Sequence, residues 1–75
     1  MKKFSLISEN RGQELESDNL ADIYEMLIKC KKDDKEHNNT DSYYVDKNTH
    51  LKDNIYEATE IVIYRYRGKI LYREA

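Results

Sequence analysis

The clearest pattern of hydrophobic and polar positions lies near the end of the chain, from Glu60 to Glu74 (EIVIYRYRGKILYRE). Two runs rich in β-branched and aromatic residues flank Arg67-Gly68, and glycine suits a tight turn that needs a positive φ. The pattern therefore predicts a β-hairpin with Arg67-Gly68 as its two-residue loop, in which Tyr66 pairs with Lys69.

The predicted hairpin has two different faces, because side chains alternate across a strand. One face carries three isoleucines and is expected to lie against the core; it consists of Ile61, Ile63, Arg65, Ile70 and Tyr72. The other face mixes aromatic, aliphatic and basic groups; it consists of Val62, Tyr64, Tyr66, Lys69, Leu71 and Arg73. A shift of one residue in the register would exchange the two faces.

A helical period appears before the hairpin. Hydrophobic residues recur at spacings of three and four, at Leu20, Ile23, Tyr24, Leu27 and Ile28. Ser17-Asp18-Asn19 offers N-cap residues just before this stripe. We expect an amphipathic helix from Leu20 to about Lys35, whose stripe covers the isoleucine face of the hairpin, with Phe4 or Leu6 completing the core.

Shorter hydrophobic runs predict the other strands. Residues 4–7 form one candidate strand, and the turn at 10–12 leads to a weaker second candidate at 13–16. Residues 42–47 form a third, and a long strand from Ile55 runs into the hairpin.

Two polar stretches are expected to connect these elements. Residues 33–41 contain no hydrophobic side chain and predict the end of the helix and a solvated loop, with Asn38 or Asn39 in the left-handed conformation. Residues 46–54 are polar apart from one leucine and are also expected to form a connection. Residues 1–75 thus predict a single small α+β domain, with one amphipathic helix packed on a small, mostly antiparallel sheet of three to five strands that ends in a C-terminal β-hairpin.

Length and charge limit the functions that suit such a domain. A chain of 75 residues buries only about 60% of its unfolded surface, so the core is small. The net charge of −2 is unevenly placed: residues 1–61 hold nine basic and fourteen acidic side chains, a net −5, and residues 62–75 hold four basic and one acidic, a net +3. No apolar run is long enough for a membrane span or a signal sequence, and the single cysteine forms no internal disulfide, so we expect a cytoplasmic protein.

Catalytic and metal-binding patterns are missing. Cys30, His37 and His50 are the only thiol and imidazole groups, and their spacings of seven and thirteen residues fit no compact zinc site. Cys30 stands near the C-terminal end of the helix, where the dipole disfavours a thiolate, and a small buried residue is the simpler interpretation. Without a phosphate-binding loop or a nucleophile motif, we expect no enzyme, no cofactor and no metal.

The candidate binding site is the basic and aromatic face of the hairpin. We call Tyr64, Tyr66, Lys69, Leu71 and Arg73 the hairpin patch, and Arg65 or Arg67 could join it from the turn region. Tyrosine and arginine are frequent at protein interfaces, which favours a larger protein as the partner. Single-stranded nucleic acid is the alternative, disfavoured by the acidic net charge. Ordinary strand residues at a sheet surface would give the same pattern, and a homo-oligomer or an acidic binding surface between Glu9 and Glu25 is also compatible with it.

The size, the bias toward Lys, Asn, Asp, Glu and Tyr, and the strand–helix–hairpin layout ending in YRYRGKILYRE resemble small accessory proteins of bacteriophages of low-GC bacteria. The resemblance implies a small protein that binds and modulates, or inhibits, a larger host or defence protein. It assigns no role to any single residue.

Overall fold

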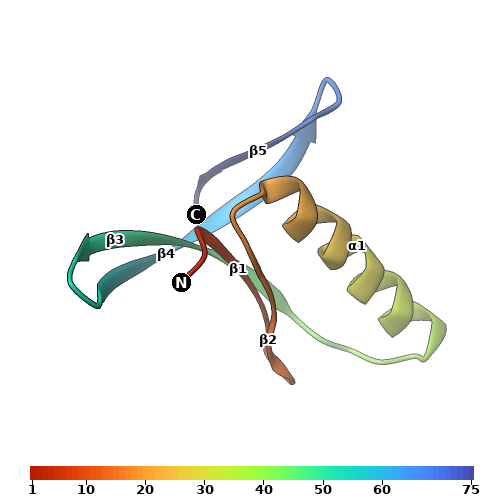
Figure 1. The fold of residues 1–75 in the computed structure, drawn as a ribbon. Coiled ribbons are helices and arrows are strands. Elements are labelled where there is room, and N and C mark those ends of the chain that lie inside the picture. Colours follow the sequence, from red (N-terminus) through yellow and green to blue (C-terminus); the bar gives the residue numbers. More distant parts are fainter.

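The five strands form one antiparallel sheet in the order β2-β1-β3-β4-β5, and the helix α1 packs on one face of it (Figure 1). The computed structural model describes all residues from 1 to 75. The elements in chain order are β1 (Phe4–Ser8), β2 (Gly12–Ser17), α1 (Leu20–Glu36), β3 (Tyr43–Lys52), β4 (Ile55–Tyr66) and β5 (Lys69–Glu74). The prediction of an α+β fold, with one helix on an antiparallel sheet and a C-terminal hairpin, is confirmed.

The turn between β4 and β5 has the predicted conformation. Arg67 and Gly68 have φ angles of 49° and 78°, and two positive values in succession are characteristic of a type I′ hairpin turn. Tyr66 pairs with Lys69, and the register continues without a shift along the hairpin. The predicted register and the two predicted faces of the hairpin are therefore confirmed.

The helix begins and ends where its capping residues indicate. Asn19 is the N-cap, and its side-chain oxygen accepts a hydrogen bond from the N–H of Ala21 at 3.0 Å. The last helical residue is Glu36, one beyond the prediction, and Asn38 follows with a φ of 54°. Neither α1 nor any other segment of the structure is a helix of the length and hydrophobicity that crossing a membrane requires.

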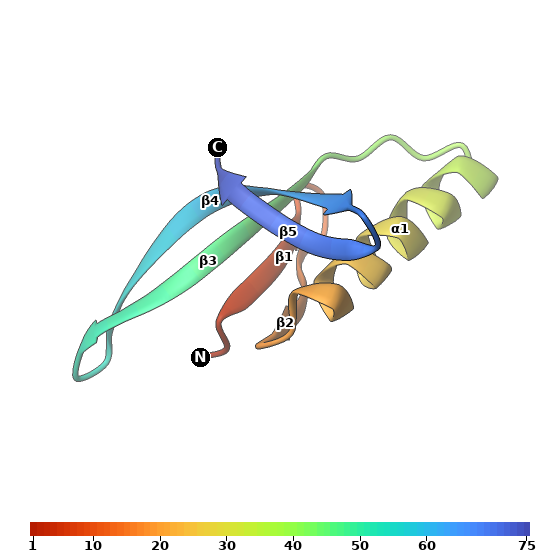
Figure 2. The ribbon, with the colours of Figure 1, turned by 90° about the horizontal axis from the view of Figure 1, so that it is seen from above.

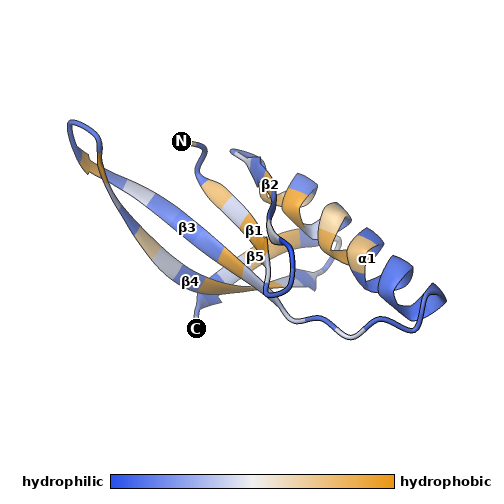
Figure 3. Ribbon diagram, turned by 90° about the horizontal axis from the view of Figure 1, so that it is seen from below, coloured by the Kyte–Doolittle hydropathy of each residue, from blue (hydrophilic) through white to orange (hydrophobic).

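The core lies between α1 and the inner face of the sheet. Its buried hydrophobic cluster consists of Phe4, Leu6, Ile23, Val45 and Ile61. Figure 3 shows hydrophobic positions in the first turns of α1 and hydrophilic ones in its last turns. The predicted helix stripe needs a correction, because Ile28 is 50% exposed and its expected place in the core is taken by Met26 and Cys30. The buried face follows the positions of Ile23 and Cys30, seven residues apart, and Ile28 lies about 140° around the helix from Ile23, away from this face.

The ends of β3 and β4 form a two-stranded arm that extends away from the rest of the sheet (Figures 1 and 2). At its base, the N–H of Asn48 donates to the carbonyl oxygen of Lys3 at 2.7 Å, and the Asn48 side-chain amide donates to Ser5 Oγ at 2.8 Å. Residues 49–58 beyond this point are all exposed. The prediction of a connection over residues 46–54 was wrong, because β3 continues to Lys52. Neither face of the arm is buried, so the sequence there lacks the alternation that marks a strand.

Candidate functional site

The hairpin patch lies on the outer face of the sheet, which is the face opposite α1. Ile61 and Ile63 point toward the core. The residues that alternate with them on β4, which are Val62, Tyr64 and Tyr66, therefore point outward. Tyr64 is 39% exposed, Tyr66 54% and Leu71 37%, which are high values for side chains of this size. The structure therefore places the five residues of the patch together on one open surface.

Cross-strand pairing makes this surface continuous. Tyr64 stands opposite Leu71 and Tyr66 opposite Lys69, and such neighbours lie about 5 Å apart at Cβ. The guanidinium of Arg67 lies over the ring of Tyr66, 5.2 Å from its centroid. Of the two arginines considered for the patch, Arg67 joins it through this contact.

The second of those arginines lies elsewhere. Arg65 alternates to the other face of β4, where it borders a cavity beside α1 with Tyr24 and Glu25. It lies outside the hairpin patch, although its charge still adds to the positive end of the hairpin.

The exposed surface is wider than the sequence indicated. Val62 precedes the patch on β4 and is 39% exposed, and Tyr44 on β3 is 41% exposed. Val45 pairs with Ile61 in the antiparallel register of β3 and β4. Tyr44 therefore stands beside Val62 on the outer face. The alternation in Tyr43-Tyr44-Val45 was the available signal, but the strand pairing was needed to place Tyr44 beside the hairpin.

The cations of the hairpin have no carboxylate partners within the chain. The ion pairs of the structure join Lys2 to Asp18 and Arg11 to Glu14 and Asp41. None involves the four basic residues of β4, the turn and β5, which are Arg65, Arg67, Lys69 and Arg73. The positive charge at this end of the molecule is therefore open to an external partner.

A second polar group joins the end of α1 to the start of β3. The hydroxyl of Tyr43 donates a hydrogen bond to the carboxylate of Asp34, which is only 8% exposed. Arg11 Nη2 donates to the same Tyr43 oxygen at 2.9 Å, and Arg11 Nε lies 2.7 Å from a carboxylate oxygen of Glu14. We call Arg11, Asp34 and Tyr43, together with Ser8 and Asp41, the polar corner.

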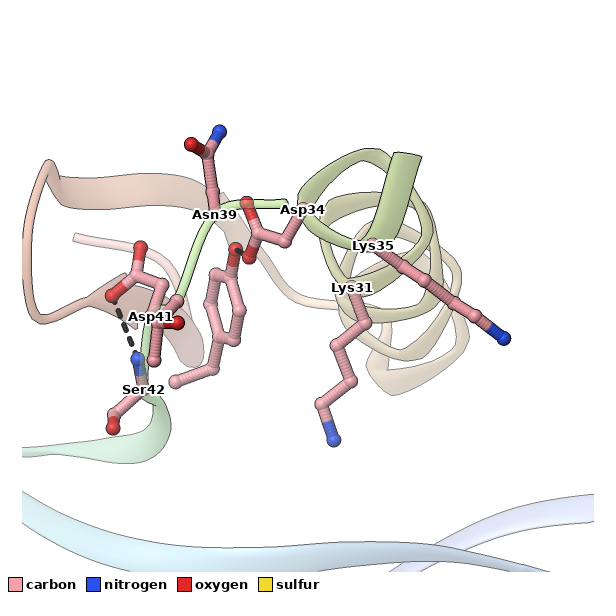
Figure 4. A pocket seen from close by; sticks show the side chains of 8 residues that line it. Lys31, Asp34, Lys35, Asn39, Asp41 and Ser42 are labelled. Atoms are coloured by element: carbon pink, nitrogen blue, oxygen red, sulfur yellow. Dashed lines mark hydrogen bonds between the residues drawn. The ribbon is translucent and has the colours of Figure 1, made fainter. Parts of the chain in front are cut away.

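Ser8 and Asp41 complete the polar corner and hold the loop after α1. Ser8 is buried and donates its hydroxyl hydrogen to Asp41, which also accepts from the N–H of Ser42 at 2.7 Å (Figure 4). The side chain of Asp41 is 4% exposed. The expectation that residues 33–41 form only a solvated loop was therefore wrong for Asp34 and Asp41, whose largely buried carboxylates accept hydrogen bonds from the hydroxyl groups of Tyr43 and Ser8.

The pKa values of the polar corner shift away from reactivity at neutral pH. The hydrogen bond from Ser8 holds the pKa of Asp41 below its usual range. Burial and the hydrogen bond to Asp34 raise the pKa of Tyr43 well above its usual range. Asp41 is thus a poor general acid and Tyr43 a poor general base or nucleophile. Beside them lies an open depression of about 530 Å³, which Lys31 and Lys35 border from α1 (Figure 4).

The thiol and imidazole groups lie apart from one another. Cys30 is buried against the core, and burial raises the pKa of its thiol. His37 caps α1, where a ring nitrogen lies 2.8 Å from the carbonyl oxygen of Asp33. His50 lies on the arm against Tyr56, with ring centroids 4.9 Å apart. Figure 1 shows the end of α1 and the end of the arm at opposite extremes of the molecule. No three His, Cys, Asp or Glu side chains form a group that could hold a metal ion.

The tip of the arm carries a separate group of exposed hydrophobic side chains. Leu51 is 56% exposed, Ile55 44% and Tyr56 40%. Sequence reasoning missed this group, because it assigned Leu51 to a connection and Ile55 and Tyr56 to the start of the long strand. The tip is the second surface on which a partner could be bound, and it supplies matched controls for the hairpin patch.

Comparison of the chain with protein-family models, curated proteins and solved structures found no match.

Proposed function

We propose that this chain is a small non-enzymatic module that binds a larger protein through the hairpin patch, Tyr64, Tyr66, Lys69, Leu71 and Arg73. The observation that carries the proposal is the combination of an uncovered sheet face and unpaired cations. Tyr64, Tyr66 and Leu71 remain exposed while the core of the same sheet is covered by α1. Water in contact with these side chains would be released when a partner covers them, which favours association.

The composition of the patch suits a protein partner. Tyrosine and arginine dominate the energetics of many protein interfaces, because they combine a large apolar surface with a polar end. The cations at Lys69 and Arg73 form a rim around Leu71, and such a rim attracts an acidic partner before contact. A partner with carboxylates around an apolar centre would complement this surface.

The polar corner supports a non-enzymatic role. Its titratable groups bind one another, and the pKa shifts of Asp41 and Tyr43 oppose proton transfer near pH 7. The thiol of Cys30 is buried and its pKa is raised. None of the side-chain hydrogen bonds of the structure joins this thiol to a base. These groups are explained by their structural role in fixing α1 and the following loop.

The resemblance to small bacteriophage accessory proteins adds a more specific proposal. It favours a partner in the cytoplasm that the module inhibits or modulates. The small size of the chain and the open hairpin patch are compatible with such a role.

A capture experiment with immobilised protein tests the proposal. The chain is incubated with bacterial lysate, with and without nuclease, beside the double variant Tyr64→Ser, Tyr66→Ser and the control variant Tyr56→Ser. We expect the same protein partner to be retained with and without nuclease by the unaltered chain and by the control, and lost by the double variant.

Binding of single-stranded nucleic acid is the second candidate. Tyrosine rings on an open sheet with flanking cations are the arrangement on which bases stack while phosphates are neutralised. The net charge of −2 disfavours it, because nucleic-acid-binding domains are usually basic. Loss of all retained material after nuclease treatment would establish this second candidate and reject the first.

A further inference from the structure

The outer edge of β5 has unpaired backbone groups. β5 is the last strand of the sheet order, so only one of its two edges is paired. Because Tyr66 and Lys69 close a two-residue turn, the residues at odd positions of β5 direct their N–H and C=O groups toward β4. The N–H of Ala75, which donates to the carbonyl oxygen of Glu60 at 3.2 Å, continues this set. Ile70 and Tyr72 therefore direct their backbone groups away from the sheet, and no hydrogen bond from a turn, a loop or a side chain reaches them.

The two edges of the sheet differ in their protection. β2, at the other edge, contains a bulge at Glu14, where the register with β1 shifts, whereas α1 contacts both β2 and β5. A bulge is a common device that prevents a further strand from pairing. β5 has no bulge and no proline. Its edge is available for strand pairing.

A groove follows this edge. One cavity of about 490 Å³ is bordered by Leu71 and Tyr72 on β5, by Tyr64 of the hairpin patch, and by Phe4 and Leu20 at the starts of β1 and α1. A second cavity of about 290 Å³ lies between the turn end of the hairpin and the first half of α1, including the exposed Ile28. Ile70 borders both cavities, so they meet at the middle of the edge. Figure 2 shows β5 in front of the other strands, with the turn of the hairpin beside α1.

We propose that the partner contributes an extended segment that pairs with β5 as a sixth strand and lies between β5 and the first half of α1. This proposal rests on the proposed function and specifies the partner of the same region. Alternate side chains of the added strand would point into the groove, against Phe4, Leu20 and Ile70, and must be apolar.

The remaining side chains of the segment would point to the outer face, beside Lys69 and Arg73. Both cations lack an ion-pair partner, so acidic residues fit these positions. Asp18 and Glu25 border the groove itself and disfavour carboxylates on its inner side. The predicted ligand therefore alternates apolar and acidic residues. Pairing of β5 with β5 of a second copy is disfavoured, because it would bring together two copies of residues 62–75, each with a net charge of +3.

Amide hydrogen exchange on the full chain tests strand addition. The probe is a capped peptide of about eight residues that alternates valine and aspartate, a length that matches an edge of this size. The controls are a peptide of the same composition with the valines and aspartates in two blocks, and a peptide that alternates valine and lysine. We expect the alternating acidic peptide to slow exchange at the amides of Ile70 and Tyr72 by at least about tenfold. The amides of Leu71 and Arg73, which already bond to β4, provide the internal reference.

Two variants separate the backbone contact from the side chain. Ile70→Pro removes the outward N–H without removing a bond to β4, and Ile70→Ala removes a similar part of the side chain but keeps the N–H. We expect the peptide affinity to fall at least about tenfold more for Ile70→Pro than for Ile70→Ala. If Ile70→Pro does not fold, the exchange measurement on the unaltered chain decides the question.

Each negative outcome has a distinct meaning. In one of them, the peptide or the captured partner binds in a way that depends on Tyr64 and Tyr66 and yet leaves the Ile70 and Tyr72 amides unprotected. This result would overturn strand addition and leave the proposed function intact. No peptide binding at about 1 mM would also overturn it. Protection of these amides that rises with protein concentration, without peptide, would assign the edge to a second copy of the chain. Failure of the proposed function would appear separately, as a chain that captures no protein partner.

Discussion

Phe4 and Tyr72 meet edge to face, with ring centroids 5.7 Å apart and planes at 67°, although β3 and β4 separate their strands in the sheet. The contact requires the sheet to curl so that its last strand approaches its second. The Lys47 ammonium group lies 5.4 Å from the centroid of the Tyr72 ring and adds a further contact at this position. The curl brings the free edge of β5 toward the start of α1, which creates the groove, and it leaves the hairpin patch on the convex side.

Differences in burial predict that three truncations lower the free energy of unfolding by different amounts. Leu6→Ala should lower the free energy of unfolding by about 2–5 kcal/mol, because Leu6 is completely buried. Ile63→Ala should cost less, since Ile63 is half-buried at the margin of the core. Ile28→Ala should change stability by no more than about 0.5 kcal/mol. Chemical denaturation measures all three, and a large cost for Ile28→Ala would return Ile28 to the core position that the sequence suggested.

The lowered pKa of Asp41 predicts that the folded chain loses stability in acid. Its pKa is lowered in the folded chain by the hydrogen bond from Ser8, so its contribution to stability is present above the usual aspartate pKa of about 3.9 and is lost as the pH falls through the folded value. Asp41→Asn should therefore reduce the loss of stability below about pH 4. Thermal unfolding between pH 2 and pH 6 measures the effect, with Asp53→Asn in the exposed turn of the arm as the control. Equal slopes for all three chains would contradict the role of Asp41.

The buried thiol predicts slow chemical modification. Cys30 is 6% exposed, and burial raises its thiol pKa, so both access and thiolate content are low. A thiol reagent should react slowly with the native chain and rapidly with the unfolded chain. A Cys30→Ala chain that carries Ile28→Cys gives the comparison, because position 28 is exposed, and it should react rapidly in the native state. Rapid native reaction of Cys30 would contradict its burial.

The unpaired cations predict an effect on association. Replacing Lys69 and Arg73 by Gln should slow association with an acidic partner, more strongly at low salt, and change dissociation less. Surface plasmon resonance at several salt concentrations measures both rates. The control is the replacement of Lys32 and Lys52 by Gln, which removes the same charge from exposed positions outside the hairpin. An equal effect of the two double variants would assign the attraction to net charge alone. If the partner were nucleic acid, the Lys69 and Arg73 variant would flatten the dependence of affinity on salt.

Local patterns predicted the parts of the fold that local chemistry determines. The hairpin follows from Arg67-Gly68 and the alternation on both sides of it, and the start of α1 follows from its cap residues. Sequence reasoning failed where the tertiary structure decides. The arm has no buried face, so residues 48–52 show no strand pattern.

The candidate site could likewise be predicted from the sequence only where local patterns determine it. The five residues of the hairpin patch could be grouped from the register alone, because their outward direction follows from the burial of the isoleucines. The extension at Tyr44 required the pairing of β3 with β4. The burial of Asp34 depends on Tyr43, nine residues later, and that of Asp41 on Ser8, which lies 33 residues earlier. No local pattern indicates that two aspartates in a polar stretch will meet such partners.

The affinity of the captured partner for the Tyr64→Ser, Tyr66→Ser variant, compared with its affinity for Tyr56→Ser, decides whether the hairpin patch is the binding surface. All three tyrosines are exposed residues of β4, and Tyr56 lies eight residues from Tyr64, at the tip of the arm. Circular dichroism should show the helix signal intact in both variants. We expect the double variant to lose binding by at least about a hundredfold, because it lacks two aromatic anchors, and Tyr56→Ser to bind normally. Normal binding by the folded double variant, with loss of binding by Tyr56→Ser, would instead place the functional surface at the tip of the arm.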